Sequence, residues 1–373
     1  MKIVQVLPVL EADVTGKAAL DFAHELVRLG HESIVISGGG ELVARLTLRG
    51  SQHIEMPLHK NSLWSLRLAG RMRRLLQELQ ADVVHVGSYM PAWITLRAWR
   101  GMPEEQRPRL VTAAHTFYRR NFYNGILASG ERVIATSRRV ADQLQERCGH
   151  KLRTPPHVVY RGVNTREFDR GAPISGHWQN RLLNDYPQLE GKNWLLMPAP
   201  LSPENGQTIF LQLLAALARQ REDVFGLVVG AAGQGGEKFA RRLEQQAFDL
   251  GLSDKVLFLG ERRDMRELYA SSQITYQLAK SSDSCGMTAA EALAMNCPVI
   301  SFVDGDAVEM LQQCFPQGLV ERGSLDALVE ASLQVLERPQ KISFSGFSHE
   351  DTAAKTLAVY RDLLQPVQAP AAG

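Results

Sequence analysis

The chain of 373 residues is too long for one ordinary hydrophobic core and suits two domains of about 150–200 residues each. Its composition is that of a globular protein, with 45% hydrophobic and 22% charged residues and no low-complexity tract. No apolar run reaches the roughly 18–20 residues of a membrane span, and the net charge of +2 argues neither for nor against a nucleic-acid partner.

The N-terminal segment, MKIVQVLPVLEADVTGK, has a short apolar run but no small-residue cleavage site, and its β-branched alternation indicates a first strand rather than a signal peptide. Cysteines are few and form no C-x-x-C pair, and no histidine lies near them at metal-ligand spacing; they are Cys148, Cys285, Cys297 and Cys314. We therefore expect reduced thiols, no metal site and a cytoplasmic protein.

Strands and helices alternate through the first half of the chain. The apolar runs predict strands over residues 2–10, 31–37, 81–87, 107–115 and 132–137. Helices are predicted over residues 15–30, 63–80, 91–101 and 138–148, with a turn into a further helix over 38–50. Because the strands are almost continuously apolar and are separated by helices, they predict a parallel sheet that is covered on both faces.

The alternation breaks at RTPPHVVYRGVNTREFDRGAPISG, where two prolines and several glycine-bearing turns indicate a domain boundary. It then restarts. Strands are predicted over residues 193–200, 225–230, 255–260, 274–279 and 298–302, and helices over 206–220, 237–251, from about 288, and 349–365. Two Rossmann-like halves follow, in which we expect function at the carboxyl ends of the strands and in the cleft between the halves.

Two nucleotide-binding classes are excluded by their missing glycine motifs. No G-x-G-x-x-G follows the first strand, and the glycine runs at 38–40 and 230–236 lie in the wrong places for a dinucleotide fingerprint. The TGK at 15–17 lacks the upstream glycine spacing of a P-loop.

The segment SSDSCGMTAAEALAMNCPVI, residues 281–300, has the residue pattern of an anion-binding helix start. Backbone N–H groups around Ser284–Met287, at the start of a helix, can hold an anion such as a phosphate. Glu291 lies about one turn inside that helix and can reach a pair of hydroxyls, which suits a ribose beside its phosphate. The alternative is that Asp283 caps the helix and Glu291 is a surface acid.

His115 follows a predicted buried strand, at the edge where the cleft is expected. A histidine in such a place is either a packed structural residue or a functional one.

Over nearly its whole length the chain resembles the family-four retaining glycosyltransferases of the GT-B fold. The resemblance is carried by ELVRLGHESIVIS, ADVVHVGS, VTAAHTFY, VVYRGVNTREF, LGLSDKVLFLGERRDMRELYA and AAEALAMNCPVI. PAWITLRAWRGMP and SGERVIATS are similar to the branch that builds lipopolysaccharide core. The resemblance implies an acceptor domain over residues 1–165, a nucleotide-sugar domain over 166–348, the two sheets facing across a cleft, and a helix and tail over 349–373 that return to the N-terminal domain.

The resemblance also implies roles for individual residues. His115 and Asp283 fall on the positions near the transferred sugar and are the expected catalytic residues. Glu291 falls on the acid that binds the donor ribose. The other expected donor-binding residues are Ser284, Cys285, Gly286, Met287, Thr288, Asn205, Lys280 and Arg262. No cofactor or metal is implied, since the nucleoside-diphosphate sugar is a substrate and protein donors meet its phosphate charge.

The chain departs from the family where the donor phosphates bind. In the loop after the first strand of the C-terminal half, the family usually carries an Arg and a Lys, and this chain has Pro200 and Asn205 there. The loss of two charge-assisted hydrogen bonds removes roughly 3–6 kcal/mol from the free energy of pyrophosphate binding. Lys280, Arg262, Arg263 and Lys17 are candidates to compensate. The double glycine of the first N-terminal loop is Asp13 and Val14, and the glycine after the family histidine is Thr116.

The implied function is transfer of a sugar from a nucleoside diphosphate to a lipopolysaccharide-core or other cell-surface glycan. The alternatives are a catalytically degenerate relative that acts as a binding or regulatory partner in surface-glycan assembly, and a nucleotide-sugar epimerase of similar architecture. On the acceptor side we expect Thr15, Gly16, Lys17, Arg119 and Arg120. A helical stripe of Arg67, Arg71 and Arg74 predicts either a solvated helix face or peripheral association with the inner face of the membrane.

Overall fold

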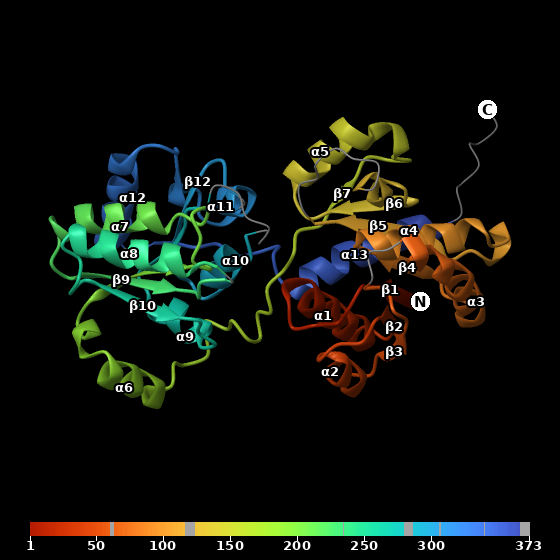
Figure 1. The fold of residues 1–373 in the computed structure, drawn as a ribbon, viewed down its shortest axis with the longest axis horizontal. Helices are drawn as coiled ribbons and strands as arrows, with labels where there is room; N and C mark the ends of the chain where they lie inside the picture. The colour runs from red at the N-terminus through yellow and green to blue at the C-terminus, as the bar shows by residue number, and fades with distance from the viewer. Residues whose placement is uncertain are drawn as a thin grey trace. The chain divides into compact units, whose positions relative to one another are not determined.

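The structure is a computed structural model that describes residues 1–59, 63–115, 124–233, 235–279, 286–305, 307–338 and 340–365. The chain folds into two compact units (Figure 1). The first unit combines Met1–Gly162 with Ser348–Gly373, and the second is Val163–Phe347. The change from one unit to the other lies inside the segment where the sequence predicts a boundary.

The first unit contains a seven-stranded parallel sheet in the order β3-β2-β1-β4-β5-β6-β7. Its strands are β1 (Lys2–Val6), β2 (Glu32–Ser37), β3 (Gln52–Glu55), β4 (Val83–Val86), β5 (Arg109–Ala114), β6 (Arg132–Ala135) and β7 (His157–Val158). The chain proceeds from β1 outward in one direction to β3 and in the other from β4 to β7. The strand order therefore reverses between β1 and β4, which is where ligands bind in open α/β sheets.

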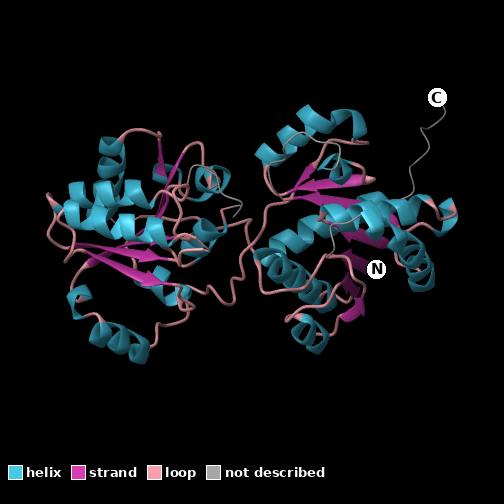
Figure 2. Ribbon diagram, in the orientation of Figure 1, coloured by secondary structure: helices cyan, strands magenta, loops and turns pink. Residues whose placement is uncertain are grey.

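Helices cover both faces of this sheet (Figure 2). They are α1 (Val14–Arg28), α2 (Val43–Leu48), α3 (Ala69–Leu79), α4 (Tyr89–Arg100), α5 (Arg138–Cys148) and α13 (His349–Leu364), with short 3₁₀ helices η1 (Leu63–Leu68), η2 (Glu104–Gln106), η3 (Asn124–Ala128) and η4 (Gly149–Lys151). Ile3 and Val83 pack into the cluster that includes α13, whereas the next residues, Val4 and Val84, pack into the cluster of α3 and α4. Successive residues are thus buried on opposite faces, which explains the continuous apolar runs.

Helix α13 completes the core of the first unit, as the family resemblance implies. Leu357, Tyr360 and Leu363 are buried there among strand residues of the sheet. The helix starts with a capping box in which Ser348 and Asp351 satisfy one another's backbone N–H groups. The C-terminal segment is therefore part of the N-terminal fold.

The second unit contains a six-stranded parallel sheet in the order β10-β9-β8-β11-β12-β13. Its strands are β8 (Asn193–Pro198), β9 (Val224–Val229), β10 (Val256–Gly260), β11 (Ile274–Gln277), β12 (Val299–Phe302) and β13 (Leu319–Val320). Its helices are α6 (Gly176–Asp185), α7 (Gln207–Ala218), α8 (Glu237–Asp249), α9 (Met265–Ser271), α10 (Met287–Ala294), α11 (Val308–Cys314) and α12 (Leu325–Glu337), with η5 (Pro187–Leu189) and η6 (Pro316–Gly318). Here the strand order reverses between β8 and β11.

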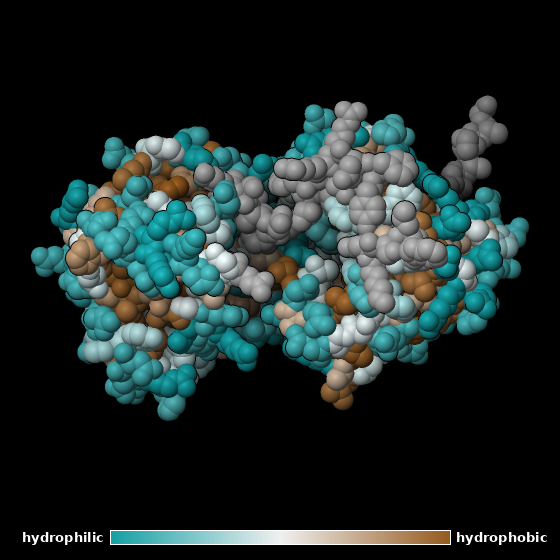
Figure 3. Space-filling view, viewed as in Figure 1, coloured by the Kyte–Doolittle hydropathy of each residue, from teal (hydrophilic) through white to brown (hydrophobic). Residues whose placement is uncertain are grey.

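The surface in Figure 3 is mostly hydrophilic on the face shown, with scattered apolar side chains. Among the residues whose exposure the structure describes, Leu48, at the end of α2, is the most exposed large apolar residue, at 88%. Within the described ranges, no helix combines the length and the apolar character that crossing a bilayer requires. The two parallel sheets with their covering helices confirm the predicted pair of Rossmann-like domains.

Candidate active site

Two helices begin at the reversal point of the second sheet, and glycine shapes both beginnings. Helix α7 follows β8 and its N-cap is Gly206, at φ 87°. Helix α10 follows β11 and its N-cap is Gly286, at φ 70°. A Cβ atom on Gly206 would lie 2.5 Å from the carbonyl oxygen of Leu278, just past β11. Glycine therefore lets the start of α7 pack against the chain that leads toward α10.

Neither of these helix N-termini has a capping hydrogen bond from a side chain in the described part of the chain. Some other helices have one, for example α5, whose N-cap Ser137 accepts from the N–H of Val140, whereas α4 and α8 also lack one. The first N–H groups of a helix have no partner within the helix and carry its positive partial charge. Two such groups of donors at one sheet edge suit an anionic ligand.

Glu291, on α10, is held by a buried tyrosine. The hydroxyl of Tyr269, in α9, donates a 3.0 Å hydrogen bond to Oε2 of Glu291. Burial, with the Glu291 carboxylate beside it, raises the pKa of Tyr269 well above its usual value, so the phenol stays protonated and donates. Glu291 is a half-buried residue, and this hydrogen bond fixes the orientation of its carboxylate.

The loop after β8 closes on itself through amide side chains, at the positions where the family carries cations. The amide nitrogen of Asn205 donates to the carbonyl oxygen of Pro200 at 2.7 Å. The amide nitrogen of Gln207 donates to the carbonyl oxygens of Pro200 and Ala199, at 2.9 and 3.2 Å. Asn205 thus orders the loop in this structure, and neither Pro200 nor Asn205 supplies positive charge.

Arg262, one of the candidate compensating cations, makes a bidentate ion pair with Asp264. Its Nε and terminal nitrogen lie 2.8 and 2.5 Å from the two carboxylate oxygens. The indole N–H of Trp178 donates to the same carboxylate at 2.6 Å. The hydrogen bonds that Arg262 donates to Asp264 raise the pKa of the guanidinium. Arg263, next to it, is exposed.

Several of the predicted residues lie outside the described ranges. These are Asp283, Ser284, Cys285 and Lys280 on the donor side, and Thr116, Arg119 and Arg120 after the family histidine. Of the other predicted donor-side residues, Gly286, Met287 and Thr288 form the start of α10. No group of three or more metal-ligating side chains occurs within the ranges that the structure describes.

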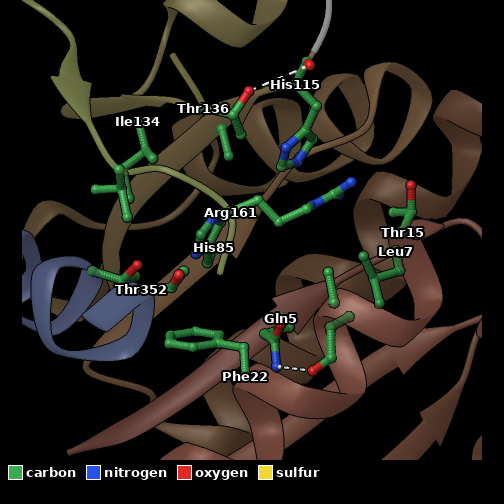
Figure 4. Close-up of a pocket in the computed structure, with 16 residues that line it drawn as sticks. Gln5, Leu7, Thr15, Phe22, His85, His115, Ile134, Thr136, Arg161 and Thr352 are labelled. Atoms are coloured by element: carbon green, nitrogen blue, oxygen red, sulfur yellow. Dashed lines mark hydrogen bonds between the residues drawn. The ribbon is translucent and has the colours of Figure 1, made fainter. Parts of the chain in front are cut away.

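The first unit has a pocket of about 110 Å³ where its own strand order reverses, at the carboxyl ends of β1, β4, β5 and β6 (Figure 4). Residues of α1, α13 and the segment after β7 complete its wall. The lining residues are Gln5, Leu7, Thr15, Ala18, Ala19, Phe22, His85, Gly87, Ala113, His115, Ile134, Thr136, Val159, Arg161, Thr352 and Thr356. The predicted His115 and Thr15 therefore share one pocket.

Two half-buried histidines line this pocket, and both are neutral at physiological pH. Burial, together with the smaller effect of the nearby charge of Arg161, lowers the pKa of His115 to about 3. Burial lowers the pKa of His85 to about 4. Nδ1 of His85 makes a short hydrogen bond with the hydroxyl of Tyr360 on α13. A neutral imidazole at His115 can donate or accept a hydrogen bond but carries no charge to a ligand.

At the start of α1, Asp13 and Val14 occupy the positions of the family's double glycine and make different contacts. Oδ1 of Asp13 accepts a 2.7 Å hydrogen bond from the N–H of Gly16 and caps the helix. Val14 is 52% exposed. Gly16 packs so closely that a Cβ would lie 2.0 Å from the carbonyl oxygen of Glu11. Lys17 is exposed and is not among the described residues that line the pocket.

Sequence reasoning missed His85, Arg161 and Tyr269. His85 and Arg161 each lie at or just after the carboxyl end of a strand, so their place in the sequence was a usable signal. The sequence carries no signal for Tyr269, because only the packing of α9 against α10 brings its hydroxyl to Glu291.

Family models match both units. Residues 15–167 match "Glycosyltransferase Family 4" and residues 180–343 match "Glycosyl transferases group 1". Among curated proteins, the lipopolysaccharide core biosynthesis mannosyltransferase LpsB of Rhizobium meliloti (strain 1021) is 24% identical over 245 residues, 62% of this chain and 66% of that protein.

Solved structures share the fold over nearly the whole chain. A glycosyltransferase from Rickettsia africae ESF-5 has a TM-score of 0.80 and 25% identity, with 98% of both chains covered. Anabaena Alr3699/HepE in complex with UDP has a TM-score of 0.73 and 20% identity, with 97% of this chain and 95% of that chain covered.

These similarities confirm the GT-B fold and do not favour the alternative of a non-catalytic binding protein. The chain belongs to the family-four glycosyltransferases and is a transferase enzyme.

Proposed function

We propose that this enzyme transfers a sugar, with retention of anomeric configuration, from a nucleoside diphosphate to an acceptor in lipopolysaccharide core or another cell-surface glycan. The name of the Rhizobium relative supports the acceptor class, because that protein is a mannosyltransferase of lipopolysaccharide core biosynthesis. The complex of Anabaena HepE with UDP supports the donor class.

One observation carries the donor site: α7 and α10 both start at the reversal point of the second sheet, from left-handed glycines and without side-chain caps. The oxygens of a diphosphate would accept hydrogen bonds from the backbone N–H groups at the starts of these two helices. Glu291 would accept hydrogen bonds from the ribose hydroxyls. Each helix N-terminus is worth about 0.3–2 kcal/mol to an anion. That partly offsets the roughly 3–6 kcal/mol of the two missing cationic contacts, so we expect binding that is measurable but not tight.

His115 would hydrogen-bond the transferred sugar as a neutral imidazole, with Asp283 placed near the same sugar. As the glycosidic bond to the diphosphate breaks, charge develops on the leaving phosphate, where donors already in place stabilise it most. That phosphate would take the proton from the acceptor hydroxyl as the new bond forms on the same face of the sugar. The mechanism then needs no protein nucleophile and no metal.

A direct test is to incubate the protein with UDP-, GDP- and ADP-sugars and deacylated lipopolysaccharide core, and to read the product by NMR. We expect one donor to be consumed, with the anomeric configuration of the donor kept in the product. A product of inverted configuration would contradict the retaining mechanism. Release of free sugar without a glycosylated product would contradict the acceptor class.

The surface of the first unit supports a further part of this proposal, namely a cytoplasmic protein that associates peripherally with the membrane. Arg67, Arg71 and Arg74 are exposed on η1 and α3, while the opposite side of α3 is buried through Ala69, Met72 and Leu76. Three cations on one outward face attract anionic lipid at about 1 kcal/mol each.

Sedimentation with phosphatidylglycerol vesicles at low salt tests this association. We expect binding that phosphatidylcholine vesicles do not support and that the triple change of Arg67, Arg71 and Arg74 to Gln abolishes. The charge-matched control changes Lys238, Arg241 and Arg242, on exposed positions of α8 in the second unit, to Gln. Equal loss in both triple variants would show a net-charge effect rather than a membrane face.

A further inference from the structure

The pocket of the first unit has a polar lining of an unusual kind. Four threonines, one glutamine, two neutral histidines and one arginine face a cavity of about 110 Å³ together with apolar side chains. Hydroxyl and imidazole groups beside apolar surface suit a sugar, which presents hydroxyls at its edge and C–H groups on its face. The volume suits part of one sugar ring rather than a large ligand.

Arg161 gives the pocket its charge. None of the described residues that line it carries a carboxylate, and both of its histidines are neutral. Arg161 acts electrostatically on His115, which places its guanidinium near that imidazole. In Figure 4 the Arg161 side chain extends beneath the ring of His115 in the direction of Thr15. Among the described residues that line the pocket, Arg161 is thus the one that carries a full charge.

The backbone that carries Arg161 is fixed on both sides. Thr352 Oγ1, on α13, donates a 2.9 Å hydrogen bond to the carbonyl oxygen of Tyr160. On the other side, a Cβ on Gly162 would lie 2.0 Å from the carbonyl oxygen of Ser348, so only glycine allows this approach. The backbone on both sides of Arg161 thus contacts the start of α13, which fixes the point from which its side chain enters the pocket.

We infer that this pocket receives the acceptor through an anionic group, a carboxylate or a phosphate on the sugar that is glycosylated, and that Arg161 binds that group. The threonine hydroxyls would form hydrogen bonds with the neighbouring sugar hydroxyls. The hydroxyl that is glycosylated would then lie beside His115. This inference rests on the proposed function, because it assigns the acceptor to this pocket. Guanidinium is the cation whose planar donors best match carboxylate and phosphate oxygens.

Three small probes test the inference on the full chain: methyl α-glucoside, methyl α-glucuronide and methyl α-glucoside 6-phosphate, followed by ligand-observed NMR. The wild type is expected to bind at least one anionic probe about tenfold more tightly than the neutral one, which corresponds to about 1.4 kcal/mol. The two anionic probes separate a carboxylate site from a phosphate site.

Variants then assign the preference to Arg161. In Arg161→Gln the anionic preference should disappear, while the affinity for the neutral probe and for nucleotide stays as in the wild type. Arg161→Lys should keep part of the preference, which guards against loss of fold in the Gln variant. Arg45→Gln, on exposed α2 of the same unit, removes one positive charge away from the pocket and should change nothing.

Several results would overturn the inference. They are equal affinity of the wild type for charged and neutral probes, no binding of any probe at millimolar concentration, and an anionic preference that survives in Arg161→Gln. Weakened nucleotide binding in Arg161→Gln would instead assign this cation to the donor diphosphate and would also overturn it. Failure of the proposed function is a separate result: the wild type would then bind no nucleotide and consume no donor, whatever the sugar probes do.

Discussion

The contact between Tyr269 and Glu291 shows how one hydroxyl fixes the orientation of a carboxylate. Glu291 could be found from the sequence because its place one turn inside a helix, after a strand, has a chemical meaning. The orientation of its carboxylate could not be found from the sequence, since the phenol that fixes it comes from another helix.

Tyr269→Phe removes only this hydroxyl. Because hydrogen bonds to charged groups are worth about 1.5–3 kcal/mol, we expect nucleotide affinity to fall by roughly tenfold or more, as measured by calorimetry. The matched control is Tyr276→Phe, which removes a buried hydroxyl that donates to Ser332 at 2.8 Å in the same unit. If both variants lose affinity equally, the effect is one of general stability and the role given to Tyr269 is wrong.

The two half-buried histidines in the pocket of the first unit predict a pH dependence with a definite sign. The pKa values of His85 and His115, at about 4 and 3, lie below the unfolded value near 6.5. The unfolded chain therefore binds protons first as the pH falls. Stability is at its full value above about pH 6.5 and declines toward pH 4, by up to about 1.4 kcal/mol per pH unit for each histidine.

Urea unfolding of the first unit between pH 8 and pH 5 measures this decline. His85→Gln should remove part of the slope, whereas His177→Gln, at an exposed position of the second unit, should leave it unchanged. A slope that is the same with and without His85 would mean that this imidazole is not held neutral by burial.

At the scale of elements, the sequence predicts most of the fold because both sheets are buried on both faces. For that reason the strands β1, β2 and β8 appear in the sequence as continuous apolar runs and could be predicted. β3, with the sequence QHIE at the sheet edge, gave no such run and was not predicted. Helix α12 was also missed, although its Ser324 cap and its apolar residues at helical spacing were readable signals.

Gly206 tests the start of α7. Alanine there would combine an unfavourable left-handed backbone with a Cβ contact of 2.5 Å to Leu278. We expect a loss of unfolding free energy of at least about 1–2 kcal/mol, together with weaker nucleotide binding. In Gly251→Ala the backbone is similar, at φ 70°, but no atom lies within 4 Å of the new Cβ. Weakened nucleotide binding in both variants would show that the geometry at Gly206 has no special part in the donor site.

Helix α13 tests the assignment of the C-terminal segment to the first unit. A chain that ends at Phe347 loses the buried Leu357, Tyr360 and Leu363, each worth about 2–5 kcal/mol by truncation to alanine. We expect hydrogen exchange to show an unfolded first unit and a protected second unit in this shortened chain. Protection of β1, β4 and β5 equal to that of the full chain would contradict the packing described here.

At the scale of the whole molecule, each unit has its own sheet, its own core and its own reversal point. The proposed donor-side groups, α7, α10, Glu291 and Tyr269, all belong to the second unit, and the pocket with His115 and Arg161 belongs to the first. The sequence predicts both sites at strand ends, where function lies in this fold class. It missed Arg161, although that residue follows the carboxyl end of β7, because only the fold brings it into one pocket with His115.

The central claim is that the second unit binds a nucleoside diphosphate with uncapped helix N-termini and Glu291, in place of the usual cations. The most direct measurement is calorimetric titration of the wild type and Glu291→Ala with UDP, GDP and ADP, with and without magnesium. We predict binding near the micromolar range for one base, little dependence on magnesium, and loss of affinity in Glu291→Ala. Absence of binding to all three nucleotides at millimolar concentration, or binding that Glu291→Ala leaves unchanged, would contradict the account.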